Sequence, residues 1–175
     1  MRKSNSILSV FALGIFALSF SAPLRADDKT DIAALYKRVS ASLKAKDVKG
    51  VVATGTPDFV SIENGTKMDA KQSQKMLEME FQSMKSIKEL YYKPTKIEVK
   101  GTNATVLSNF KMVATMGGEG GKTHEMTGSG TSKETLLKTK KGWLIKSMET
   151  LTSKSTMDGK PMQMPAPPPQ TKKKP

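Results

Sequence analysis

The stretch GTPDFVSIENGTKMDAKQ, Gly55 to Gln72, decides the fold of this chain. Its residues 58–63 are rich in Phe, Val and Ile, which predicts a short strand. Asn64-Gly65 favours a two-residue hairpin turn, because both positions of that turn need positive φ. Residues 66–68 then form a return strand. Asp69 and Gln72 have the spacing of a capping box, which predicts that a helix begins here.

Two further helices are predicted before this stretch. Thr30 or Asp31 can cap the first, and an apolar stripe at helical spacing follows the cap. The stripe consists of Ile32, Leu35, Tyr36, Val39 and Leu43. Asp47 is positioned to cap a second, shorter helix over residues 48–53.

The sequence after Ile87 reads as strands. Leu90 to Lys100 forms one strand, and its Pro94 indicates a sheet edge or a bulge. Residues 104–115 alternate in the period of two that a half-buried strand requires. Residues 122–139 and 143–151 form two more strands. Helices followed by meandering strands predict an α+β fold, in which three helices pack on one face of a curved, mainly antiparallel sheet.

Both ends of the chain differ in composition from its middle. A basic start, an apolar run over Ile7 to Phe20 and a small residue at Ala26 predict a signal peptide over residues 1–26, with cleavage after Ala26. An uncleaved membrane anchor is the alternative. Residues 153–175 are rich in Pro and Lys and predict a disordered basic tail. The folded domain is therefore expected over residues 27–152 of an exported protein, periplasmic or extracellular.

The charge of the chain is strongly positive. Lys and Arg number 29, Asp and Glu number 16, and the formal net charge is +13. Such a surface favours contact with anionic envelope polymers or lipid headgroups. The basic residues are mainly scattered lysines with few aromatic neighbours, which argues against nucleic-acid binding. The chain has no cysteine, so its stability depends on packing without disulfides.

The predicted order of elements resembles the nuclear transport factor 2-like superfamily, and within it the SnoaL-like branch. The resemblance is carried by LKAKDVKGVVA (43–53), PDFVSIENGTKMDAKQ (57–72) and GWLIKSM (142–148). It implies a cone whose open end forms an apolar pocket, and homodimers that pair through their sheets. The side chains expected to line the pocket are Tyr36, Phe59, Tyr92, Phe110, Met112 and Trp143.

The same superfamily contains ketosteroid isomerases, which use a carboxylate as a proton shuttle. In that family a tyrosine on helix one and a protonated aspartate on a later strand stabilise the oxyanion. Aligned without gaps, the position of that base falls on Glu63. Because Glu63 adjoins Asn64-Gly65, the alternative is a solvated hairpin residue. The position of the helix-one tyrosine falls on Val39, which cannot donate a hydrogen bond. Tyr36 lies one turn earlier. Glu134 is close in sequence to the remaining acidic position, but the register of its strand is not fixed by the sequence.

His124 is the single histidine and the second candidate catalytic residue. A lone histidine in a cavity strand can act as an acid or base, or it can make one structural hydrogen bond. Thioethers suit Cu(I), but the methionines form no closely spaced array, and no metal site or cofactor is predicted.

Three functions remain open from the sequence. The first is the binding of a small apolar or amphipathic ligand, or of a partner, in the cone without catalysis. The second is a lyase or isomerase reaction with Glu63 as general base. The third is an envelope adaptor that acts through the basic surface and tail.

Overall fold

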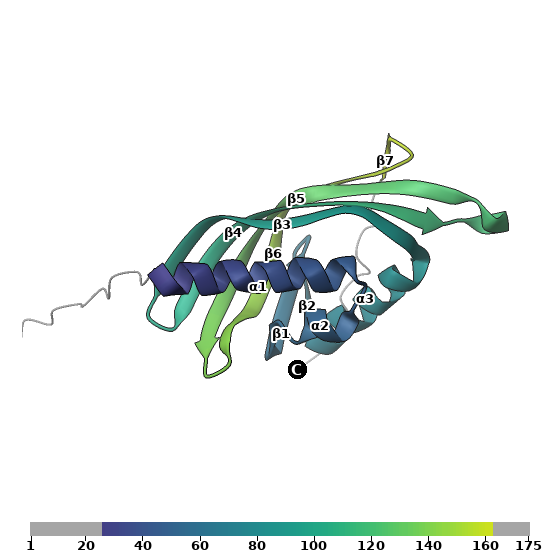
Figure 1. Cartoon of the computed structure of the whole chain (residues 1–175). Helices are drawn as coiled ribbons and strands as arrows, with labels where there is room; N and C mark the ends of the chain where they lie inside the picture. The colour runs from purple at the N-terminus through teal and green to yellow at the C-terminus, as the bar shows by residue number, and fades with distance from the viewer. Residues whose placement is uncertain (1–25, 163–175) are drawn as a thin grey trace, which may run out of the picture.

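The computed structural model describes residues 26–162, which fold into three α-helices on one face of a curved sheet (Figure 1). In chain order the elements are α1 (Ala26–Lys44), α2 (Val48–Val52), β1 (Gly55–Glu63), β2 (Thr66–Asp69), α3 (Ala70–Ser83), β3 (Met84–Lys100), β4 (Asn103–Gly117), η1 (Glu119–Gly121), β5 (Thr123–Thr139), β6 (Gly142–Met157) and β7 (Lys160–Pro161). The predicted α+β architecture is confirmed. Residues 1–25 of the predicted signal peptide and residues 163–175 of the predicted tail lie outside the described residues.

Helix α1 buries the apolar stripe that the sequence predicts. Ile32, Leu35, Tyr36 and Val39 recur at helical spacing and are all buried. The helix begins at Ala26, earlier than the cap predicted at Thr30 or Asp31. The reason is that the first turn is anchored to the sheet. The buried carboxylate of Asp28 accepts hydrogen bonds from Trp143 Nε1 at 3.2 Å and from Lys138 Nζ at 2.5 Å.

Residues 55–72 form the predicted hairpin and helix start, although β1 begins at Gly55 and not at the predicted Asp58. Asn64 and Gly65 have φ values of 49° and 76°, so the hairpin turn between β1 and β2 uses positive φ at both positions. Asp69 accepts from the backbone N–H of Gln72 at 2.8 Å, and the Gln72 side chain accepts from the Asp69 N–H at 3.0 Å. This capping box fixes where α3 begins.

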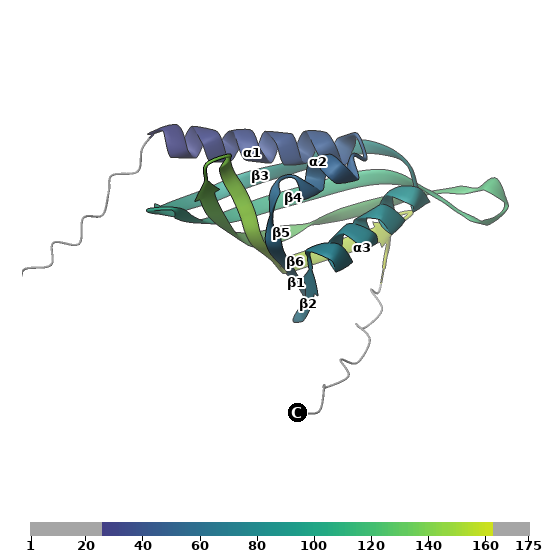
Figure 2. The same cartoon turned by 90° about the horizontal axis from the view of Figure 1, so that it is seen from below.

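The strands form one sheet in the order β2-β1-β6-β5-β4-β3, with β7 added to β6. The pair β1–β6 is parallel and the other pairs are antiparallel. Strand β3 lies at the edge, and its register shifts next to Pro94, so the prediction of an edge or bulge is confirmed. Figure 2 shows α1 and α3 over the same face of this sheet, and α2 contacts both of them.

Two further predicted boundaries are wrong. β3 begins at Met84 instead of Leu90, because Met84 is buried and pairs with Met116 of β4. The tail was expected from Ser153, but β6 continues to Met157. Its residues there pair with residues 126–130 of β5, so backbone hydrogen bonds hold a stretch that has few large apolar side chains.

Two clusters of buried side chains join the helices to the sheet. The larger cluster contains the α1 stripe together with Val106, Leu136, Trp143 and Ile145, among others. The smaller cluster contains Phe81, Met84 and Ala114. Within the described part of the chain, no helix combines the length and the apolar character needed to cross a membrane.

Candidate functional site

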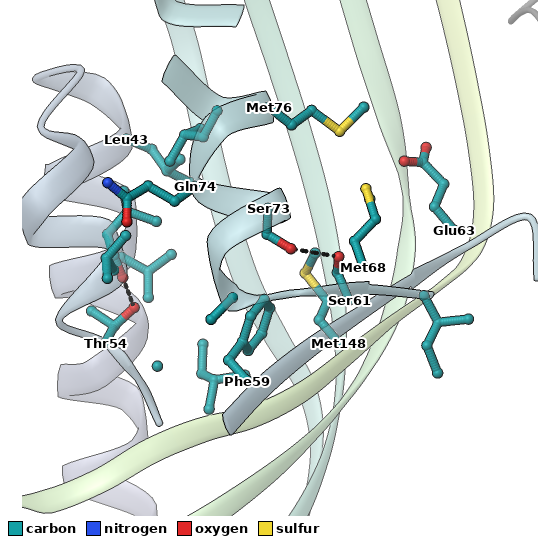
Figure 3. Close-up of a pocket in the computed structure, with 18 of the residues that line it drawn as sticks. Leu43, Thr54, Phe59, Ser61, Glu63, Met68, Ser73, Gln74, Met76 and Met148 are labelled. Atoms are coloured by element: carbon teal, nitrogen blue, oxygen red, sulfur yellow. Dashed lines mark hydrogen bonds between the residues drawn. The ribbon is translucent and has the colours of Figure 1, made fainter. Parts of the chain in front are cut away.

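A cavity of about 310 Å³ lies between the sheet and the helices (Figure 3). Its volume is at the small end of the roughly 300–1,000 Å³ that is usual for ligand pockets. Most of its lining side chains are apolar. The lining residues are Val39, Leu43, Val51, Val52, Thr54, Gly55, Thr56, Phe59, Ser61, Ile62, Glu63, Met68, Ala70, Ser73, Gln74, Met76, Leu77, Glu80, Tyr92, Ile145, Met148 and Thr150.

Strand β1 and helix α3 supply most of this lining. Alternate residues of β1 point the same way, so Phe59, Ser61 and Glu63 all reach the cavity. The hydroxyls of Ser61 and Ser73 lie 2.9 Å apart, and this hydrogen bond ties β1 to α3 across the cavity wall. The capping box of Asp69 therefore matters for the site, because it fixes the first turn of the helix that carries Ser73.

Tyr92 lines the cavity with its ring and connects it to a buried carboxyl group. Its hydroxyl donates to Oε1 of Glu134 at 2.5 Å and lies 2.8 Å from the Ser132 hydroxyl. Tyr36 and Ser108 each donate to the other oxygen of Glu134 at 3.0 Å. Three hydroxyl donors thus satisfy a glutamate whose side chain is fully buried.

The electrostatics of this network keep both tyrosines protonated. Burial raises the pKa of Tyr36 and of Tyr92 far above the ordinary value, and the negative charge of Glu134 raises them further. The rings stack, with centroids 5.5 Å apart. The two phenols therefore act as hydrogen-bond donors to Glu134, and the arrangement makes a rigid wall for the cavity.

The mouth of the cavity is marked by lining residues that remain exposed to solvent. Val52 and Met76 are 42% and 38% exposed. Glu80 is also exposed, and Glu63 is half-buried. The pKa of Glu80 is raised, chiefly because the surrounding protein reduces the hydration of its carboxylate and also because Glu63 carries a like charge nearby. Figure 3 shows Glu63 on the same side of the cavity as Met68 and Met76.

The residues expected to line the pocket fall into two groups. Phe59 and Tyr92 line the cavity, as does the candidate base Glu63. Tyr36 and Trp143 are instead buried in the larger core cluster. Phe110 stacks on Tyr92 with ring centroids 6.2 Å apart, and Met112 packs on the smaller cluster. Tyr36 and Trp143 lie outside the lining because α1 packs directly on the sheet there, and Phe110 and Met112 are also outside it.

His124 lies away from the cavity. Its Nδ1 is 2.7 Å from Oδ2 of Asp158, and both side chains are partly exposed. Asp158 also accepts from the backbone N–H of Glu125 at 2.8 Å. His124 thus fastens the turn between β6 and β7 to β5, and the structure does not bring it together with Glu63. Among the described residues, no three His, Asp or Glu side chains are grouped to hold a metal ion.

Two features of the site were missed from the sequence. Glu80 was not singled out, because its proximity to Glu63 depends on how α3 lies against β1. Glu134 was noted without a fixed position. The sequence did contain a signal for its position. Side chains two positions apart on a strand share a face, so Glu134 lies on the same face as Leu136, which is expected to face the core.

Comparison with known proteins places this geometry in a family. The model of the SnoaL-like domain matches residues 24–149, so the chain belongs to the SnoaL-like family. No curated protein sequence matches the chain.

Solved structures share the fold at low sequence identity. A conserved protein from Planctomyces limnophilus is 17% identical with a TM-score of 0.62, and the match covers 71% of this chain and 95% of that one. A candidate dehydratase of the NTF2-like family from Streptomyces avermitilis is 11% identical with a TM-score of 0.58, covering 71% and 95%. A candidate scytalone dehydratase from Novosphingobium aromaticivorans is 16% identical with a TM-score of 0.57, covering 73% and 86%. These likenesses show the fold alone.

Proposed function

We propose that the chain is a binding protein that holds a small apolar or amphipathic ligand in the cavity, without catalysing a reaction. The observation that carries the proposal is the apolar cavity of about 310 Å³ between β1, α3 and the sheet. Burial of a ligand's apolar surface supplies about 25 cal/mol for each Å² removed from water. The rigid wall formed by Tyr92 and Glu134 favours binding further, because little order is lost when a preformed pocket is filled.

The second candidate function is proton transfer by Glu63 in the same cavity. Its position in the lining favours this function, as do the neighbouring carboxyl of Glu80 and the names of two structural neighbours, which are described as candidate dehydratases. Against it, the Glu63 carboxylate makes no hydrogen bond or ion pair in the described part of the chain, whereas a general base needs a partner or substrate that orients it. The candidate acid His124 lies elsewhere.

Export is proposed for the same protein. The basic start, the apolar run Ile7 to Phe20 and Ala26 have the pattern of a cleaved leader. Expression of the full chain with an intact export pathway, followed by mass measurement, tests this directly. A mature protein that begins at Asp27 supports export, and a protein that retains Met1 contradicts it.

The binding function is tested by native mass spectrometry of that purified protein. We expect a bound small molecule, and the same spectrum reports whether the chain forms the proposed homodimer. In the variant Ser73→Phe the ring is directed into the cavity, so the ligand should be lost. Gln82→Phe adds the same ring to an exposed position of α3 and should keep it.

Three outcomes discriminate between the functions. A spectrum without ligand in wild-type protein contradicts the binding proposal, as does a ligand that Ser73→Phe retains. Chromatography of the released ligand before and after prolonged incubation with fresh protein separates binding from catalysis. An unchanged ligand supports binding, and a converted one whose conversion Glu63→Gln abolishes supports the second candidate.

A further inference from the structure

The charges around the cavity differ from those of the chain as a whole. Lys and Arg outnumber Asp and Glu by 29 to 16, yet the two charged side chains in the cavity lining are both carboxylates, Glu63 and Glu80. Neither carboxylate forms an ion pair within residues 26–162. Several other acidic groups there do, among them Glu89 with Lys111 and Glu98 with Lys96, each at 2.7 Å. The carboxylates that border the cavity are thus left without a cation.

A buried hydroxyl in the same lining also lacks a partner. Thr56 is 6% exposed, and its Oγ1 makes no hydrogen bond within the described part of the chain. The hydroxyl lowers the pKa of the exposed Asp58 carboxyl, although the two groups do not meet the geometry of a hydrogen bond. A buried hydroxyl without a hydrogen-bond partner is unfavourable. A polar atom of a bound molecule would remove that cost.

We infer that the ligand is a small amphipathic organic cation, such as an amine or a quaternary ammonium compound, whose apolar body fills the cavity and whose charged head lies between Glu63 and Glu80. The inference rests on the proposed binding function and specifies the chemistry of the ligand. The head lies at the mouth, where Glu80 and Met76 reach solvent, so the cation keeps part of its hydration. Met68 and Met76 line the same part of the cavity and would place polarizable thioether side chains next to the cationic head.

The charges of Glu63 and Glu80 agree with this assignment. Two like charges beside an apolar region repel each other, and their repulsion contributes to the raised pKa of Glu80. A cation placed between them cancels the repulsion and gains attraction from both carboxylates. An anionic ligand would add a third negative charge, and a neutral one would leave the repulsion in place. The site therefore discriminates by charge as well as by shape.

Isothermal titration calorimetry with three probes of equal chain length tests the inference on the mature protein. The probes are octyltrimethylammonium, 1-octanol and octanoate, used below the concentrations at which they aggregate. We expect the cation to bind most tightly and octanoate most weakly. Each of Glu63→Gln and Glu80→Gln should weaken cation binding about fivefold relative to 1-octanol binding, the upper range for a partly exposed charge pair. Glu119→Gln, in the distant η1 turn, is the control for an equal change of net charge.

The outcomes separate this inference from the proposed function. Loss of the preference for the cation in the double variant Glu63→Gln/Glu80→Gln, with 1-octanol still bound and thermal unfolding unchanged, supports it. Wild-type protein that binds 1-octanol as tightly as the cation overturns it and leaves the binding function standing. So does a preference that persists in the double variant. If none of the three probes binds wild-type protein and native mass spectrometry finds no ligand, the binding function fails and the inference fails with it.

Discussion

The hydroxyl of Tyr92 donates a 2.5 Å hydrogen bond to Oε1 of Glu134, while the ring of the same tyrosine lines the cavity. Tyr36 of α1 donates to the other oxygen of Glu134 at 3.0 Å. One buried carboxyl group therefore joins helix α1, strands β3 and β5 and the wall of the cavity. This relationship means that the shape of the cavity depends on a polar group that a ligand does not touch.

Removal of the Glu134 carboxyl should destabilise the protein strongly. Glu134→Ala leaves the buried hydroxyls of Tyr36, Tyr92 and Ser108 without their acceptor, and we expect the free energy of unfolding to fall by about 3 kcal/mol. Glu134→Gln keeps one acceptor oxygen and should cost about half as much. Urea unfolding measures both. Lys133→Ala, at the exposed neighbouring position, is the control. Equal stability of Glu134→Ala and Lys133→Ala would contradict the role assigned to the network.

Local interactions made much of the fold predictable. The Asn64-Gly65 turn and the Asp69–Gln72 capping box depend on residues one to three positions apart, and both formed as expected. The stripe on α1 follows from helical periodicity alone. The boundaries that were missed depend on partners elsewhere: Asp28 is held by Trp143, and the end of β6 is held by β5.

The candidate site was less predictable, because its contacts are distant in sequence. Tyr36 and Glu134 are 98 positions apart, and no periodicity shows that they meet. Tyr36 and Trp143 were expected in the pocket because they are large aromatic side chains, but such side chains pack a core equally well. Only the relative placement of α1, α3 and the sheet decides which of them borders an unfilled space.

The capping box at Asp69 should control the stability of the cavity's edge. Asp69→Ala removes the acceptor for the Gln72 backbone N–H, so we expect a loss of about 1 kcal/mol in unfolding free energy. Faster hydrogen exchange in the first turn of α3 should accompany it, and that turn leads to Ser73. Lys71→Ala changes a side chain in the same turn without touching the cap and should have little effect. Unchanged exchange in α3 would show that packing alone fixes the helix.

Reduced hydration of the Glu80 carboxylate, together with repulsion from Glu63, should make stability depend on pH. Because the folded protein raises the pKa of Glu80, the folded state holds its proton more firmly than the unfolded chain. The favourable contribution is fully present below the ordinary pKa and is lost as the pH rises through the raised value. Glu80→Gln removes this loss. The variant should gain about 0.5 kcal/mol in unfolding free energy relative to wild type once the pH has risen above the raised pKa, and should gain nothing below the ordinary pKa of a glutamate.

Glu63→Gln is the second variant in the measurement of stability against pH. Glu63→Gln deletes the like charge and should give a gain of the same sign, since it lowers the pKa of Glu80 toward its ordinary value. Chemical unfolding at several pH values supplies both curves. A difference between Glu80→Gln and wild type that does not change with pH would show that the carboxylate is fully hydrated in the folded protein.

Replacement of His124 should leave the cavity unaffected and loosen one edge of the sheet. His124 Nδ1 lies 2.7 Å from Asp158, and this contact, together with the Glu125 N–H, lowers the pKa of Asp158. The lowered pKa contributes stability above the ordinary value that is lost as the pH falls through the folded value. Because both groups are exposed, His124→Ala should change global stability only slightly. We expect faster hydrogen exchange in β7 and unchanged binding of the cavity ligand. No contact in the described part of the chain links His124 to the cavity. Loss of ligand binding in His124→Ala would therefore contradict this placement and make His124 a site residue again.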